Sequence, residues 1–97
     1  MTRLLQDPRK AGQPVLVLYD VQDDKRRTRV MAACKDYGLG RMQYSAYQGK
    51  LTRTARLELE TRLVKALGNS QGTITVLQLE QTQLDTATTI EQLGDED

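Results

Sequence analysis

Asp20 is the carboxylate in this sequence that is best placed to do chemistry. It follows Val15 to Tyr19, an unbroken apolar and aromatic run, and the charged stretch Asp23 to Arg27 comes shortly after it. A short unbroken run of this kind predicts a strand buried on both faces, because a half-exposed strand alternates with polar positions. Asp20 therefore lies where a central strand emerges toward a charged turn, which indicates a functional site. The alternative is that Asp20 only caps the turn or the next helix.

The absence of histidine restricts the chemistry that the chain could perform. It excludes Ser-His and Cys-His pairs, imidazole zinc ligands and an ordinary general base that titrates near neutral pH. Catalysis would have to rest on carboxylates and a hard cation such as Mg²⁺. Cys34 is the sole cysteine, so the sequence predicts neither a disulfide nor a thiolate metal site and favours a cytosolic, cytoplasmic location.

Length and composition predict one small globular domain. The 97 residues are 38% hydrophobic and 28% charged, which is typical of a globular chain. No window approaches the ~20 apolar residues of a membrane span, so we expect no membrane partner. Residues 1–14 contain both prolines, show no periodicity and lack the apolar segment of a secretory signal, which predicts a flexible leader.

Charge is distributed unevenly along the chain, although the net charge is only +1. All 14 Lys and Arg lie in residues 1–67 with seven Asp and Glu, which gives +7, and the six other acids lie in residues 68–97, which gives −6. A basic body with an acidic tail is typical of proteins that bind polyanions such as nucleic acids. The alternative is that the charges only form solvated helix faces and a tail that aids solubility.

Residues 23–38 predict the first helix. Asp23 or Asp24 would cap its N-terminus, and Gly38 followed by Leu39 is a usual helix stop. Its buried stripe, at helical spacing, would consist of Val30, Met31, Cys34 and Tyr37.

Residues 40–51 alternate with period two, which predicts one bent strand or two short ones, with Gly49 at a turn or bulge. One face would carry Met42, Tyr44 and Ala46. The other face would carry Arg41, Gln43, Ser45 and Tyr47.

Thr52 is expected to cap a second helix that runs to about Leu67, with Glu58 and Arg62 as an i,i+4 ion pair on its surface. A further strand is expected over residues 73–79. The buried side of the helix would consist of Ala55, Leu59, Leu63, Ala66 and Leu67.

The element order βαββαβ predicts an α+β fold, a ferredoxin-like sandwich over residues 15–80 with both helices on one face of the sheet. The other face of the first strand would then expose large apolar side chains, which a small monomer rarely tolerates. We therefore expect a homodimer. Residues 81–97 form an acidic C-terminal tail in which Ile90 and Leu93 could add an edge strand to this sheet or an exchanged strand to the partner's.

Several short motifs over residues 15–80 together resemble the Cas-two family, the small CRISPR-associated partner of the Cas-one integrase. The motifs are, in order, Tyr19-Asp20, Asp23-Asp24-Lys25-Arg26-Arg27, Lys35-Asp36-Tyr37-Gly38 and Gln43-Tyr44-Ser45. The sequence departs from the family in its longer leader and in Tyr47, where phenylalanine is common. Neither departure involves Asp20.

The resemblance implies a ferredoxin-like homodimer that joins the Cas-one integrase in capturing foreign DNA as new spacers. Some members are described as Mg²⁺-dependent endonucleases of RNA or DNA, and their metal-binding aspartate corresponds to Asp20. Asp20 is therefore the expected catalytic and metal residue, with Mg²⁺ as the cofactor. Two Asp20 carboxylates that met at the dimer axis would repel each other or recruit a cation.

We interpret the chain as a dimeric scaffold that binds double-stranded DNA with the Cas-one integrase. A stand-alone Mg²⁺-dependent endonuclease acting on RNA or DNA is the alternative, and a ferredoxin-like regulatory domain for a small ligand is a third hypothesis, although no Gly-rich phosphate loop supports it. Phosphate contacts that position a duplex without reading its sequence are expected from Lys25, Arg26, Arg27, Arg29, Lys35 and Arg41.

Overall fold

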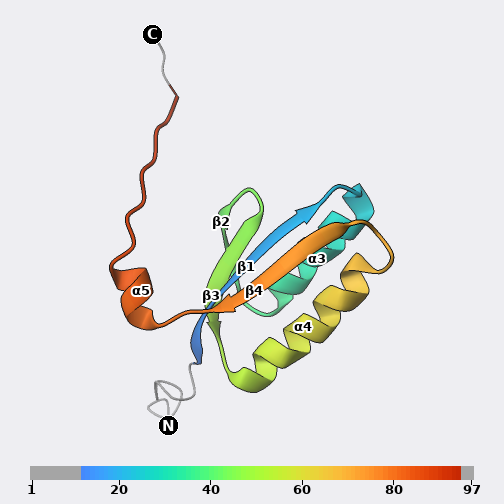
Figure 1. Ribbon diagram of the computed structural model, residues 1–97, viewed down its shortest axis with the longest axis horizontal. Helices are drawn as coiled ribbons and strands as arrows, with labels where there is room; N and C mark the ends of the chain where they lie inside the picture. Colours follow the sequence, from blue (N-terminus) through green and yellow to red (C-terminus); the bar gives the residue numbers. More distant parts are fainter. Residues whose placement is uncertain (1–11, 95–97) are drawn as a thin grey trace.

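The computed structural model describes residues 12–94. The sheet has the strand order β2-β3-β1-β4 with antiparallel neighbours, and α3 and α4 run side by side over one of its faces (Figure 1). The predicted ferredoxin-like fold is confirmed. Residues 1–11 of the predicted leader lie outside the described residues. The elements in chain order are β1 (Gln13–Val21), α3 (Asp24–Asp36), β2 (Gly40–Gln43), β3 (Ala46–Leu51), α4 (Arg53–Leu67), β4 (Gly72–Gln78) and α5 (Gln81–Asp85).

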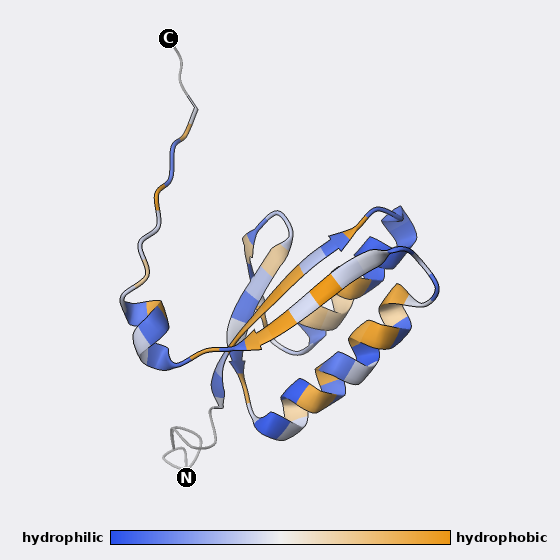
Figure 2. Ribbon diagram, in the orientation of Figure 1, coloured by the Kyte–Doolittle hydropathy of each residue, from blue (hydrophilic) through white to orange (hydrophobic). Residues whose placement is uncertain are grey.

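Strand β1 lies between β3 and β4 and supplies much of the core, as its apolar sequence shows (Figure 2). Val15, Val17 and Tyr19 are buried beneath the helices. The prediction of burial on both faces holds for only one face within a single chain. On the other face Leu18 is 39% exposed, and Leu77 of β4, the register partner of Leu16, is 41% exposed. Within residues 12–94 neither long helix covers this face, because α3 and α4 both pack on the opposite one.

Helix α3 follows the sequence-based expectation closely. Asp23 is its N-cap, and its carboxylate accepts a hydrogen bond from the backbone N–H of Arg26 at 2.9 Å. Ala33 joins the buried stripe that contains Val30 and Cys34. After the helix ends, the Leu39 N–H donates back to the carbonyl of Cys34 at 3.1 Å, which closes the chain against the helix end.

The segment after α3 forms two short strands, and its predicted faces are only partly correct. Arg41 and Tyr47 are register partners on one face, as predicted, and Tyr47 is fully buried opposite Val17. The register shifts between Arg41 and Gln43, so Gln43 pairs with Ala46 although the two were expected on opposite faces, and Tyr44 lies exposed in the turn. Gly49 is neither turn nor bulge. It lies within β3, where a Cβ atom would approach Leu39 Cδ2 to 2.7 Å, so a larger residue would force the Leu39 side chain to shift.

Helix α4 begins at the predicted cap, where the Thr52 hydroxyl accepts a hydrogen bond from the Ala55 N–H at 3.2 Å. Leu59, Leu63 and Ala66 form its buried side. The predicted pair between Glu58 and Arg62 is wrong. Arg62 instead pairs with Asp36 at 2.6 Å, because the packing of α4 against α3 places that carboxylate closer, and Arg56 pairs with Glu60 at 2.9 Å.

The tail begins with the short helix α5, not with a strand. Residues 86–94 have no regular secondary structure, and Ile90 and Leu93 are exposed (Figure 1). Within the described part of the chain, therefore, the tail adds no edge strand to its own sheet. An exchanged strand with a second copy stays a prediction, and residues 95–97 lie outside the described range. None of the helices between residues 12 and 94 is long and apolar enough to span a membrane.

Candidate functional site

Asp20 is exposed near the C-terminal end of β1, on the face that the helices leave uncovered. It pairs in register with Thr73 of β4. The next β4 position, Gly72, has φ +155°, and a Cβ atom there would lie 2.8 Å from the Asp20 carbonyl oxygen. Close pairing at this end of the sheet therefore requires glycine, and this pairing fixes the backbone that carries the carboxylate.

Asp20 borders two open hollows. The larger, of about 470 Å³, is lined also by Gln22, Asp23, Ser70, Gln71 and Gly72. The smaller, of about 250 Å³, is lined also by Tyr19, Val21, Gln22, Arg27, Tyr44 and Ser45. A phosphodiester could therefore approach the carboxylate from either side.

A single chain supplies few ligands for a metal ion at Asp20. Within residues 12–94 no three His, Cys, Asp or Glu residues are grouped so that they could hold a metal ion. Asp23 borders the same hollow, but it already caps α3. Mg²⁺ commonly keeps several waters and uses one or two carboxylates, so Asp20 fits as one ligand of such an ion.

Arg26 and Arg27 are engaged in holding the fold together. Arg27 Nη1 donates to the carbonyls of Val21 and Gln22 at 3.0 and 3.2 Å, and its other Nη pairs with Asp24. Arg26 Nη1 donates to the Ala66 carbonyl, near the end of α4, at 3.5 Å. These two side chains brace the β1–α3 connection and the α3–α4 contact, so each is less free to bind phosphate than the sequence suggested.

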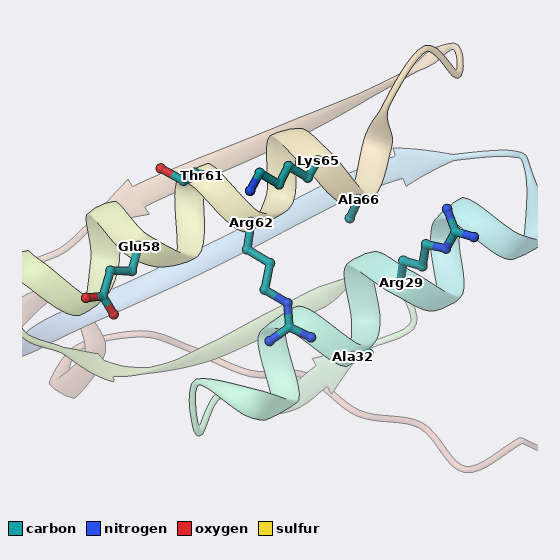
Figure 3. A pocket seen from close by; sticks show the side chains of 7 residues that line it. All are labelled: Arg29, Ala32, Glu58, Thr61, Arg62, Lys65 and Ala66. Carbon is teal, nitrogen blue, oxygen red and sulfur yellow. The ribbon is translucent and has the colours of Figure 1, made fainter.

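Arg29 lies on the outer side of α3, at a hollow of about 540 Å³ between α3 and α4. Arg62 and Lys65 of α4 border the same hollow, and Figure 3 shows the three basic side chains around it. Sequence reasoning missed these two residues of α4. The available signal was their i,i+3 spacing, which puts both on one face of the helix beside the buried positions Leu63 and Ala66. Only the packing of α4 against α3 brings them close to Arg29.

The other three predicted nucleic-acid residues are exposed but lie apart. Lys25 is in the first turn of α3 and Lys35 in the last, about 15 Å apart at 1.5 Å per residue. Arg41 lies in β2, with its guanidinium over the Tyr44 ring at 5.2 Å. The structure thus brings Arg27 and Asp20 to one hollow and Arg29 to another, and it does not gather all six basic residues into one patch.

Cys34 and Tyr19 are held in their neutral forms. Burial raises the pKa of the Cys34 thiol to about 11, so this cysteine is not a thiolate nucleophile at neutral pH. Burial, with a contribution from Tyr47, also raises the pKa of Tyr19. Neither Tyr19, which lines the smaller hollow beside Asp20, nor Cys34 in the core therefore supplies a base near neutral pH.

Comparison with known proteins gives concordant matches. The family model described as CRISPR associated protein Cas2 matches residues 13–87. A CRISPR-associated endoribonuclease Cas2 of Desulforudis audaxviator is 44% identical over 61 residues, which are 63% of this chain and 58% of that protein. A CRISPR-associated endonuclease Cas1/endonuclease Cas2 fusion of Thermoproteus tenax is 33% identical over 73 residues, 75% of this chain and 28% of the fusion. Each match covers less than two thirds of the relative's own length.

The fold has a match among solved structures as well. The crystal structure of Streptococcus pyogenes Cas2 superposes with a TM-score of 0.69 and 26% sequence identity, over 80% of this chain and 99% of that one. The family match runs from the start of β1 through α5 and includes Asp20 and both long helices. The chain therefore belongs to the Cas2 family of CRISPR-associated proteins.

Proposed function

We propose that this chain is a dimeric scaffold that binds double-stranded DNA together with the Cas1 integrase during spacer acquisition. The observation that carries the proposal is the division of the molecule into an uncovered apolar sheet face and an opposite, helical side that bears basic residues. The fusion of a Cas1 to a Cas2 in Thermoproteus tenax supports a partnership between such chains.

The uncovered face is suited to a second copy of the chain. Leu16, Leu18 and Leu77 lie together across β1 and β4, and two of them are substantially exposed. Monomeric proteins rarely leave such patches in water, and two sheets that pack face to face bury them. A dimer built in this way would direct α3 and α4 of both copies outward, so that their basic residues remain available.

Duplex DNA would then contact the helical side. Arg29 and Lys65 are exposed beside the α3–α4 hollow, and the Arg62 side chain, although paired with Asp36, is partly exposed. Contacts of this kind to phosphates supply affinity and position without reading sequence. A protein that must hold spacers of any sequence needs that property.

Salt titration of DNA binding tests the proposal. Arg29→Ala combined with Lys65→Ala should reduce the slope of log affinity against log salt by about one unit for each phosphate that is no longer neutralised, equally for unrelated duplexes. Arg53→Ala, an exposed arginine at the other end of α4, is the matched control. Arg26 and Arg27 are avoided because their removal also breaks hydrogen bonds within the fold. An unchanged slope in the double variant would contradict this binding surface.

A second candidate function is Mg²⁺-dependent cleavage of RNA or DNA. The exposure of Asp20 between two hollows favours it, and the relative from Desulforudis audaxviator is called an endoribonuclease. Asp20 and its counterpart in a second copy would hold the ion, which would supply an activated water for attack on a phosphodiester. Cleavage that depends on Mg²⁺, is stopped by a chelator and is lost in Asp20→Asn would establish this activity.

A further inference from the structure

Tyr44 stands out among the four tyrosines by its exposure. Tyr44 is 76% exposed in the turn between β2 and β3, whereas Tyr19 and Tyr47 are buried and Tyr37 is half-buried. A large aromatic side chain left in water at a turn gains nothing from burial there. Its ring is therefore not used in core packing and is available to a ligand.

The side chain and backbone of Tyr44 are held in place. The Arg41 guanidinium lies 5.2 Å from the ring centroid, over one face of the ring. Arg41 Nη2 and the Tyr19 hydroxyl both donate to the Tyr44 carbonyl, at 3.0 and 3.3 Å. An aromatic ring fixed in this way loses little conformational entropy when a ligand stacks on it, which favours binding.

The surroundings of the ring suit a nucleotide. Tyr44 borders the 250 Å³ hollow together with Asp20, Arg27 and Ser45. The Ser45 hydroxyl lines the same hollow and can donate to a phosphate there, whereas Arg27 is already engaged by backbone carbonyls and by Asp24.

A second copy on the uncovered face of the sheet would leave the ring accessible. Arg41 pairs in register with Tyr47, which is buried beneath the helices, so Arg41 lies on the helix-covered side of the sheet. The Tyr44 ring packs against Arg41 and therefore lies toward that side as well. The Tyr44 ring thus lies outside the proposed dimer interface, whereas Asp20, which lines the same hollow, is on the uncovered face.

We propose that Tyr44 is a stacking platform for an unpaired nucleobase, which it holds beside Asp20. This inference deepens the proposed nucleic-acid function by adding a single-stranded contact to the duplex contact on the helices. The shared chemistry is a nucleobase with its phosphate, from DNA or from RNA. Aromatic stacking of this kind is sequence-tolerant, because every base has a π face.

The test uses the full chain and short single-stranded oligonucleotides that contain 2-aminopurine, whose fluorescence is quenched when it stacks. We expect quenching on binding to the parent protein and to Tyr44→Phe, which keeps the ring. Tyr44→Leu should abolish the quenching and weaken single-strand binding by about 5- to 150-fold, the range expected when one base no longer stacks on an aromatic ring. Circular dichroism should show an intact fold, since the side chain is exposed.

Deoxyribose and ribose versions of the oligonucleotide distinguish DNA from RNA as the source of the base. Equal quenching and affinity in parent and Tyr44→Leu would overturn the proposal, as would a parent that does not quench either version. Binding to a blunt duplex is measured alongside and should be the same in parent and Tyr44→Leu. A parent that does not bind the duplex would count against the scaffold proposal alone, so the two failures can be told apart.

Discussion

The two faces of β1 differ in what they contact and therefore in what they can contribute. Val15, Val17 and Tyr19 lie beneath α3 and α4 in the core, whereas Leu18 and Asp20, one position away along the chain, are exposed. Because side chains alternate along a strand, neighbouring residues belong to different environments. One face is committed to stability of the single chain, and the other is free for a second copy and for ligands. Substitutions at adjacent positions should therefore give qualitatively different defects.

The largest effect is expected on the covered face. Val17→Asp would bury an unpaired carboxylate in a fully enclosed position, at a cost of about 3 kcal/mol or more. That cost is a large fraction of the ~5–15 kcal/mol by which such domains are stable. We expect the variant to lose the cooperative thermal unfolding transition, which circular dichroism measures. If the variant had the melting temperature of the parent, the helices would not exclude water from this face of β1.

Leu18→Asp, at the next residue, should instead leave the chain folded and separate the dimer. The side chain is 39% exposed in one chain, so a carboxylate there remains solvated until a second copy covers it. Light scattering should give about twice the chain mass of 11.0 kDa for the parent and one chain mass for the variant. A parent that is monomeric at tens of micromolar, or a variant that still dimerises, would place the interface elsewhere.

A smaller effect is expected at the end of the sheet that supports Asp20. Gly72→Ala forces a side chain into a backbone conformation with φ +155° and against the Asp20 carbonyl oxygen, which should destabilise the chain by about 1–3 kcal/mol. Gly40→Ala is the matched control, because a Cβ atom there would meet only a carbonyl oxygen at 3.9 Å. Chemical denaturation of both variants measures the difference. Equal stabilities would show that the glycine is not needed for this pairing.

Periodicity and capping residues predicted the elements well because these signals are local. The apolar run at Val15 and the caps at Asp23 and Thr52 depend on neighbours within one turn or one strand. The same pattern placed Asp20 at the end of the central strand. The apolar run alone predicted burial on both faces. The element order, which puts both helices on one side of the sheet, correctly predicted that the other face lacks a cover in a single chain.

The errors in the sequence-based account arise where tertiary packing decides. Gln43 and Ala46 were expected on opposite faces but pair with each other, because a register shift in β2 changes the alternation without a sequence signal. Arg62 pairs with Asp36 of α3 and not within its own helix, because the two helices pack side by side. The carbonyls that engage Arg26 and Arg27 are likewise brought close only by the folded backbone.

Asp20→Asn, combined with an integration assay, tests the central claim most directly. The substitution keeps the shape of an exposed side chain and removes its charge, so we expect little change in stability and loss of any Mg²⁺-dependent cleavage. If the chain is a scaffold, spacer integration by the cognate Cas1 integrase continues at the parent rate with this variant. Loss of integration by a variant that is folded, dimeric and still binds duplex DNA would contradict the scaffold account.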